Sequence, residues 1–146
     1  RIITEAYREN ERATTKIKCA KAFESILLNA TLRIYDEDLI LGLVSLMSID
    51  YVNRTAQLHI MIGGSENRGK GAGTFAIKEL VRHGFYNLNL RRIELGVLAS
   101  NARAMAVYEK VGFVCEGIKR QAVYKNGMYV DLIMMALLRD EVKEIG

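Results

Sequence analysis

Residues 58–73 read LHIMIGGSENRGKGAG, and this stretch decides the fold. Its first five residues are apolar apart from His59, which is typical of a β-strand. The next part holds 5 of the chain's 12 glycines, namely Gly63, Gly64, Gly69, Gly71 and Gly73. An amphipathic helical stripe follows at Ile77, Leu80, Val81, Gly84, Phe85 and Leu88. The stretch therefore predicts a strand, a glycine-rich turn and a long helix that begins near Gly73.

A strand that enters such a turn and then a helix is typical of phosphate binding, because free backbone N–H groups and the helix dipole face one anion. Three motifs compete for the turn. Residues 64–70 match the Walker A pattern G-x-x-x-x-G-K, but Gly71 follows and has no hydroxyl for Mg²⁺, and the preceding strands read as antiparallel. Residues 71–76 match the dinucleotide pattern G-x-G-x-x-A, but the first glycine lies too far from its strand, and Glu94 begins a strand instead of ending one. The third pattern, R-x-x-G-x-G at 68–73, fits best.

The segments before this stretch predict one helix and a meander. Apolar residues recur at helical spacing at Cys19, Phe23, Ile26 and Leu27, which predicts a helix over 17–28. Runs of β-branched and aliphatic residues at 31–35, 40–49 and 55–62 are joined by short polar connections. They predict three antiparallel strands.

The segments after it continue an α/β pattern. Residues 93–97 alternate as a strand, and Asn101 and Gly112 are good first and last signals for a helix of about 11 residues. Residues 113–118 read as a strand, and Asn126-Gly127 is a strong hairpin signal between the last two strands. One mixed α/β sheet accounts for the whole order.

The composition fits one globular domain over 1–146. Half of the residues are hydrophobic and 26% are charged. The longest mostly apolar run, 39–49, is well short of the roughly 20 residues of a membrane span. The net charge of 21 − 17 = +4 is spread along the chain, so we expect a small anionic ligand and no nucleic acid or membrane as partner. Cys19 and Cys115 lack metal-ligand spacing, which predicts free thiols in a reducing compartment, the cytoplasm. We also expect Cys115 to be a small buried thiol.

Several motifs then stand in a family order. They are the strand and turn at 58–73, Ala99-Ser100-Asn101, VYEKVGF at 107–113, Glu116-Gly117 and YKNGMYVD at 124–131. In this combination the chain resembles the GNAT superfamily of acetyl-CoA-dependent N-acetyltransferases over 23–141. It most resembles the branch of ribosomal-protein N-terminal and spermidine acetyltransferases. The resemblance implies a mixed, mostly antiparallel central sheet flanked by helices, with the family's first strand missing from this chain.

The resemblance also implies how the cosubstrate acetyl-CoA binds. The glycines let the backbone approach the pyrophosphate, while Arg68 and Lys70 supply charge. The pantetheine arm pairs like an added strand along 60–62. The implied cofactor-binding residues are Ile60, Met61, Ile62, Arg68, Gly69, Lys70, Gly71, Ala72, Gly73, Thr74, Asn101 and Lys110. No metal is expected.

Acetyl transfer to an amine needs a base for the amine and an acid for the leaving thiolate. Tyr108 matches the family's tyrosine acid. Ribosomal alanine acetyltransferases carry a glutamate where this chain has Gly96, and spermidine-type relatives often carry one where it has Gln57. The base is therefore open. The remaining candidates are Glu94, His59 and Glu116, and each has an alternative role as a salt-bridged, core or solvated residue.

The expected function is direct transfer of an acetyl group to a primary amine in a ternary complex. The acceptor is a protein N-terminus, a polyamine or an amino sugar. A polyamine pocket needs clustered carboxylates, whereas the first part of the chain mixes glutamates with lysines and arginines. One alternative is a non-catalytic acyl-CoA-binding sensor or interaction module. A nicotinamide oxidoreductase is a second, and a homodimer is among the assemblies that the sequence allows.

Overall fold

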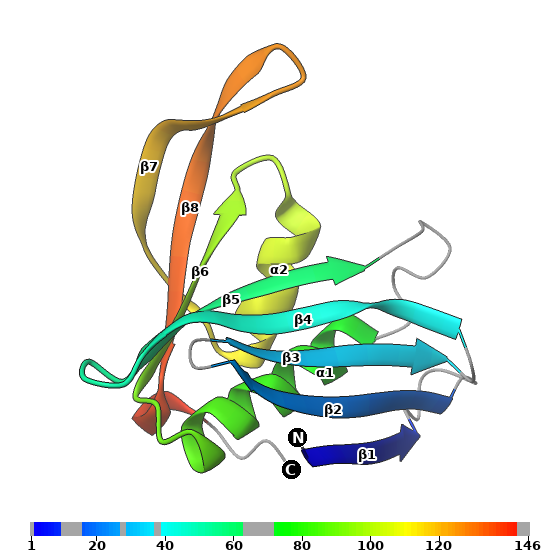
Figure 1. The fold of residues 1–146 in the computed structure, drawn as a ribbon. Helices are drawn as coiled ribbons and strands as arrows, with labels where there is room; N and C mark the ends of the chain where they lie inside the picture. Colours follow the sequence, from blue (N-terminus) through cyan, green and yellow to red (C-terminus); the bar gives the residue numbers. More distant parts are fainter. Residues whose placement is uncertain (1, 10–15, 27–28, 37–38, 63–71, 143–146) are drawn as a thin grey trace.

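The computed structural model describes residues 2–9, 16–26, 29–36, 39–62 and 72–142, which form one mixed sheet and its helices (Figure 1). The sheet has eight strands in the order β1-β2-β3-β4-β5-β6-β8-β7. The strands are β1 (Ile2–Glu9), β2 (Lys16–Ile26), β3 (Asn29–Asp36), β4 (Leu39–Asp50), β5 (Thr55–Ile62), β6 (Arg92–Leu98), β7 (Val114–Lys125) and β8 (Met128–Leu138). The helices of these ranges are α1 (Ala72–Arg82), its π-helical continuation η2 (His83–Asn87), α2 (Ala102–Val111) and the 3-10 helix η3 (Arg139–Glu141).

The pairing confirms the predicted fold class. Strands β1 to β5 pair antiparallel in chain order, so β3, β4 and β5 form the predicted meander. Strand β6 is parallel to β5 and antiparallel to β8, which in turn pairs antiparallel with β7. The sheet is therefore mixed and mostly antiparallel, as the resemblance implies.

The core lies between the sheet and the two helices. Alternate residues of β4, β5 and β6 are buried, among them Val44, Leu46, Leu58, Ile93 and Leu95. The predicted helical stripe packs on them, and at Gly84 an added Cβ would lie 2.9 Å from Leu46 Cδ1 and 3.1 Å from Ile93 Cδ1. A side chain at position 84 would have to push these two methyl groups aside, so helix and sheet approach closely there.

The other face of β4 and β5, which we call the open face, carries exposed side chains. They are Leu43, Met47, Gln57, His59 and Met61. In Figure 1 this face lies in front and α1 and α2 lie behind the sheet. One face of these strands is thus buried and the other is exposed, as expected for a sheet that helices cover on one side only.

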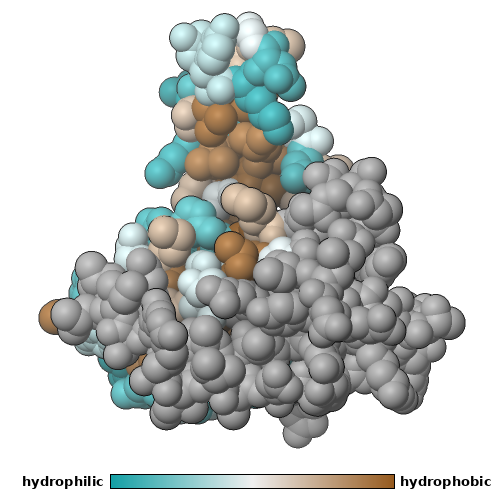
Figure 2. All heavy atoms as spheres, turned by 45° about the vertical axis from the view of Figure 1, so that its right-hand side comes forward, coloured by the Kyte–Doolittle hydropathy of each residue, from teal (hydrophilic) through white to brown (hydrophobic). Residues whose placement is uncertain are grey.

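Strands β7 and β8 extend beyond the body as an arm, residues 119–131, because Leu132 is the last β8 residue that pairs with β6. Its turn has positive φ at both Asn126 (52°) and Gly127 (77°), which confirms the predicted hairpin. Strand β7 is continuous from residue 114 to 125 with two register shifts. Figure 2 shows hydrophobic surface below the tip of the arm. Tyr124, Met128 and Tyr129 of the arm are exposed, as is Ile118 next to it.

The prediction of a helix over 17–28 is wrong. Residues 16–26 form β2, which pairs on one edge with β1 and on the other with β3. Backbone pairing on both edges outweighs a helical spacing that rests on four apolar residues. The chain also has its own edge strand, β1, which the sequence did not predict.

Candidate active site

The defining feature of the site is a fork between β5 and β6. The two strands pair only at Thr55–Arg92, Ala56–Ile93 and Gln57–Glu94. Beyond this point β5 stays with β4 as far as Ile62, and β6 stays with β8 as far as Leu98. The strands diverge in Figure 1. Along 58–62 the β5 edge that faces β6 therefore has no strand partner among the described residues, and its backbone groups can pair with an extended ligand.

Helix α1 begins at Ala72, at the far side of the glycine-rich turn. Arg68, Gly69, Lys70 and Gly71 lie outside the described residues, whereas Ala72, Gly73 and Thr74 form the first helical turn. No acidic residue occupies that turn, so the positive end of the helix dipole is not offset there. In the sequence, the start of α1 comes after the part of β5 that has no β6 partner. This is the order expected for a phosphate site that follows the binding edge of an extended ligand.

The predicted cofactor strand is β5. Ile60 is half-buried and packs against the core under α1 and α2, whereas Met61 is 70% exposed on the open face. Ile62 is the last residue of β5 and pairs with Gly42. The three backbones line the fork whichever way their side chains point.

Tyr108 lies on α2, behind the sheet. Asn101 begins this helix, because its Oδ1 accepts a hydrogen bond from the Ala104 N–H (3.1 Å), and the Asn101 N–H donates to the Leu98 carbonyl (2.9 Å). Gly112 ends it at φ 119°. Both predicted helix signals are confirmed, and α2 starts where β6 ends.

The Tyr108 side chain is buried, with 7% of its surface exposed, and its ring meets Phe113 edge-on at 6.0 Å. Burial raises the pKa of the phenol above its ordinary value of 10.0. A raised pKa keeps the hydroxyl protonated, which is the state that a general acid needs. Lys110, two residues further along the same helix, is exposed.

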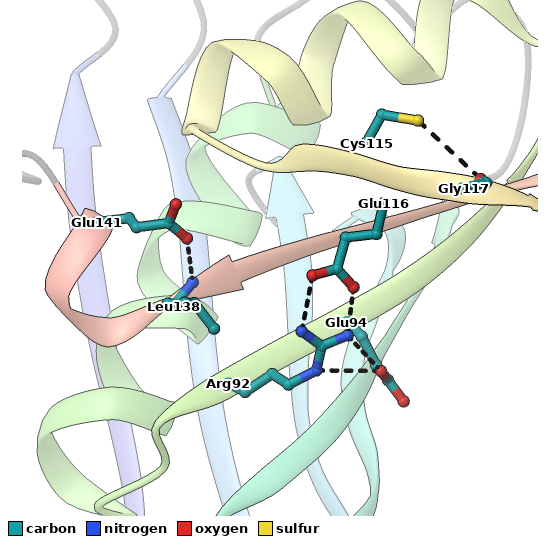
Figure 3. A network of polar contacts seen from close by, with 7 residues as sticks. All are labelled: Arg92, Glu94, Cys115, Glu116, Gly117, Leu138 and Glu141. Atoms are coloured by element: carbon teal, nitrogen blue, oxygen red, sulfur yellow. Dashed lines mark hydrogen bonds and ion pairs between the residues drawn. The ribbon is translucent and has the colours of Figure 1, made fainter.

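Two of the candidate bases share one cation. Arg92 lies between Glu94 and Glu116 (Figure 3), with its Nη2 3.0 Å from Glu94 Oε2 and its Nη1 2.9 Å from Glu116 Oε2. Its hydrogen bond to Glu116 raises the pKa of Arg92, and the same bond lowers the pKa of Glu116. Arg92 is not among the site residues predicted from the sequence, although residues 92 and 94 lie on one face of β6, the strand predicted at 93–97.

His59 lies on the open face of β5, opposite Ser45 on β4. It follows Gln57, which forms the last β5–β6 pair with Glu94. The next β6 residue on that face is Gly96. His59 and Gly96 therefore stand on opposite sides of the fork.

The described residues hold no cluster of three or more His, Cys, Asp or Glu side chains that could bind a metal ion. Cys115 is exposed on β7, so its predicted burial is wrong. The reason is that β7 is the edge strand of the sheet. None of the described helices is long and apolar enough to span a membrane.

The family model of the acetyltransferase (GNAT) domain matches residues 3–114. The chain therefore belongs to the GNAT acetyltransferase family. Spermidine N(1)-acetyltransferase of Vibrio cholerae is 36% identical over 116 residues, which cover 77% of this chain and 66% of that protein. Ribosomal-protein-serine acetyltransferase of Escherichia coli is 29% identical over 107 residues, which cover 73% and 59%.

Solved structures agree with this assignment. A crystal structure of spermidine N-acetyltransferase from Vibrio cholerae in complex with CoA and spermine has a TM-score of 0.74 at 33% identity, covering 78% of this chain and 68% of that one. Another structure from this organism is described as dodecameric. The chain spans 53–66% of the length of the spermidine and ribosomal-protein acetyltransferases that it matches.

Proposed function

We propose that the protein transfers an acetyl group from acetyl-CoA to a primary amine. The observation that carries this proposal is the fork, a strand edge free for an extended ligand that leads to the start of α1. Membership of the GNAT family indicates acetyl-CoA as the ligand of the fork, because a structural neighbour was crystallised with CoA. Bound acetyl-CoA supplies a thioester, and the chain's residues hold and orient it.

In this proposal the backbone of 60–62 pairs with the pantetheine arm, and the turn at 68–74 holds the pyrophosphate. Asn101 already uses its Oδ1 to cap α2, so its amide NH₂ is the group available to the cofactor. Lys110 contributes a positive charge. A β5 backbone N–H polarises the thioester carbonyl, as backbone donors do in other acyl-transfer sites.

His59 is the base that the geometry supports best. It is exposed on the open face next to the last β5–β6 pair, and a neutral imidazole has a ring nitrogen that can accept the proton of the amine. Glu94 is a weaker candidate because its Oε2 already contacts the Arg92 guanidinium at 3.0 Å.

Tyr108 is the proposed acid. Its hydroxyl donates a proton to the CoA thiolate as the tetrahedral intermediate collapses, and the buried ring keeps it protonated. The direct attack leaves no acyl group on the enzyme. Cys115 lies on the edge strand and takes no part.

A thiol-release assay with acetyl-CoA tests the proposal across N-terminal peptides, polyamines and amino sugars. We expect release that depends on the acceptor and falls about 100-fold or more in Tyr108→Phe, which removes only the hydroxyl. Tyr129→Phe on the exposed arm is the matched control and should leave the rate unchanged. A basic limb due to Tyr108 should lie above pH 10.0.

A second candidate function is a non-catalytic acyl-CoA-binding module. It is favoured by one observation, namely that Glu94 and Glu116 are both engaged by Arg92. This module would bind CoA, seen as a raised melting temperature, and release no thiol with any amine. Equal behaviour of Tyr108→Phe and the wild type in such a screen would replace the first proposal by the second.

Self-association is the third part of the proposal. The arm exposes Tyr124, Met128 and Tyr129, and a two-stranded ribbon of this kind is marginal alone in water. A neighbour from Vibrio cholerae is dodecameric. Light scattering after size-exclusion chromatography should give a mass of at least twice the 16.4 kDa of one chain, and a mass of 16.4 kDa would contradict self-association.

A further inference from the structure

The fork has two sides on the open face. His59 stands on the β5 side, and Gly96 stands on the β6 side, each two residues beyond the last pair that joins the strands, Gln57–Glu94. Both residues are exposed. A group that reaches the free edge of β5 from the open face must therefore pass between them.

The Leu132 side chain, which comes from β8, lies beside Gly96. Leu132 pairs with Leu98, and Gly96 pairs with Met134, so Leu132 is the diagonal neighbour of Gly96. A Cβ at position 96 would lie 2.9 Å from Leu132 Cδ2, 3.1 Å from its Cγ and 3.2 Å from its Cδ1. The isobutyl group of Leu132 thus occupies the space that a side chain at position 96 would take.

The carboxylates beside this contact are engaged within the protein. Arg92, two rungs below Gly96 on β6, forms ion pairs with both Glu94 and Glu116. Asp131, next to Leu132 on β8, accepts a hydrogen bond from the Gln121 N–H at 2.8 Å. The β6 side of the fork is therefore apolar at Leu132, and these three carboxylates already have partners other than an acceptor with several cationic groups.

We propose that Leu132, packed on Gly96, is a specificity-determining residue that forms the apolar wall of the acceptor site opposite His59. This inference rests on the proposed acetyl transfer and narrows its substrate class. The acceptor is a primary amine with an uncharged, apolar group next to it and no further cation nearby. A peptide N-terminus with an apolar first residue fits this description, and a polyamine does not.

The fraction of neutral amine at pH 7 also favours a peptide N-terminus as the acceptor. A peptide α-amine ordinarily titrates near pH 8, so roughly one molecule in ten is neutral at pH 7, against about one in a thousand for an alkyl amine. A site whose nearest carboxylates are engaged by Arg92 can therefore deprotonate the first kind of acceptor far more readily.

The test compares three acceptors, namely two peptides that differ only in a leucine or a glycine at the first position, and spermidine. In Leu132→Ala we expect kcat/KM to fall about tenfold or more for the leucine peptide and less than twofold for the glycine peptide, because only the former uses the wall. Leu132→Glu should raise the ratio of kcat/KM for spermidine over the leucine peptide. Val52→Ala, an apolar truncation at a residue that is 91% exposed in the turn between β4 and β5, is the matched control and should leave kcat/KM for all three acceptors unchanged.

Gly96→Ala moves the wall without truncating it, because the added methyl group displaces Leu132. It should reduce kcat/KM for the leucine peptide more than for the glycine peptide, and adding Leu132→Ala should cause little further loss. The melting temperature of each variant, with and without CoA, shows that it folds and binds the cofactor.

Equal losses for both peptides, or no loss for either, would overturn the proposal for Leu132 while wild-type turnover still supported acetyl transfer. A wild-type preference for spermidine over both peptides would also overturn it. Failure of the proposed function looks different, because no acceptor would then release thiol and Tyr108→Phe would match the wild type.

Discussion

The Arg92 guanidinium lies between two carboxylates. One belongs to Glu94, two residues away in the sequence, and the other belongs to Glu116, 24 residues away. The contact joins β6 to β7 across β8, and the side chains are partly exposed, with 44% of the Glu116 side chain accessible. Solvent screens such pairs, so each contributes below about 1 kcal/mol to the free energy of unfolding. The contribution of the Arg92–Glu116 contact to stability nevertheless depends on pH.

The pKa of Glu116 is lowered in the folded protein by its hydrogen bond to Arg92. A lowered pKa adds stability above the unfolded value of about 4.5, and this stability is lost as the pH falls through the folded value. We expect Glu116→Gln to lower the melting temperature at pH 7 by up to about 3 °C and the difference from the wild type to shrink below pH 4.5. Thermal unfolding between pH 3 and pH 7 measures this.

Glu109→Gln removes an exposed carboxylate from α2 and serves as the control, with a much smaller effect on the melting temperature. A difference between Glu116→Gln and the wild type that stays constant down to pH 3 would contradict the role assigned to the Arg92 contact.

Helix α2 is the element that connects the fold to the proposed acid. Its first turn depends on the Asn101 side chain, and its last on Gly112 in the left-handed region. Replacing an N-cap asparagine by alanine ordinarily costs about 1 kcal/mol. We expect Asn101→Ala to lower the melting temperature by about 2–4 °C and Asn101→Asp to retain most of it, because aspartate accepts the same bond.

Both variants are compared by thermal unfolding and by thiol release. If α2 orients Tyr108, the rate should fall in Asn101→Ala. Asn101→Asp keeps the cap but lacks the NH₂ group proposed for the cofactor, so its melting temperature should recover while its KM for acetyl-CoA stays raised. A variant Asn101→Ala as stable as the wild type would mean that the cap seen at Ala104 contributes nothing.

The elements differ in how well the sequence predicts them. The stripe at 77–88 and the alternation at 93–97 were predictable because one period spans a whole element whose apolar face is buried. Residues 17–28 were not, because the pairing of β2 with strands on both sides is a property of the sheet. The fork likewise depends on where the pairing of β5 with β6 ends. The contact of Leu132 with Gly96 depends on two residues that are distant in the sequence.

On the scale of the whole molecule, the fork divides the sheet into two parts. One part holds β1 to β5 and the other holds β6, β8 and β7, and only three residue pairs join them. Helices α1 and α2 pack behind both parts and share the core. A ligand that pairs with the free edge of β5 would complete the hydrogen bonding at the junction, so cofactor binding should act on the coupling of the two parts.

Hydrogen exchange measured by mass spectrometry with and without CoA tests this directly. We expect CoA to slow amide exchange in peptides that cover 55–62, because the free β5 edge gains partners, and to leave peptides from the arm at 119–131 unchanged. At a CoA concentration 100 times its Kd, the free energy of unfolding should also rise by about 2.7 kcal/mol. NADH at the same concentration is the control and should do neither. Slowed exchange over the whole chain, with no excess at 55–62, would show that CoA stabilises the protein without occupying the fork, and the site would then have to be sought elsewhere on the sheet.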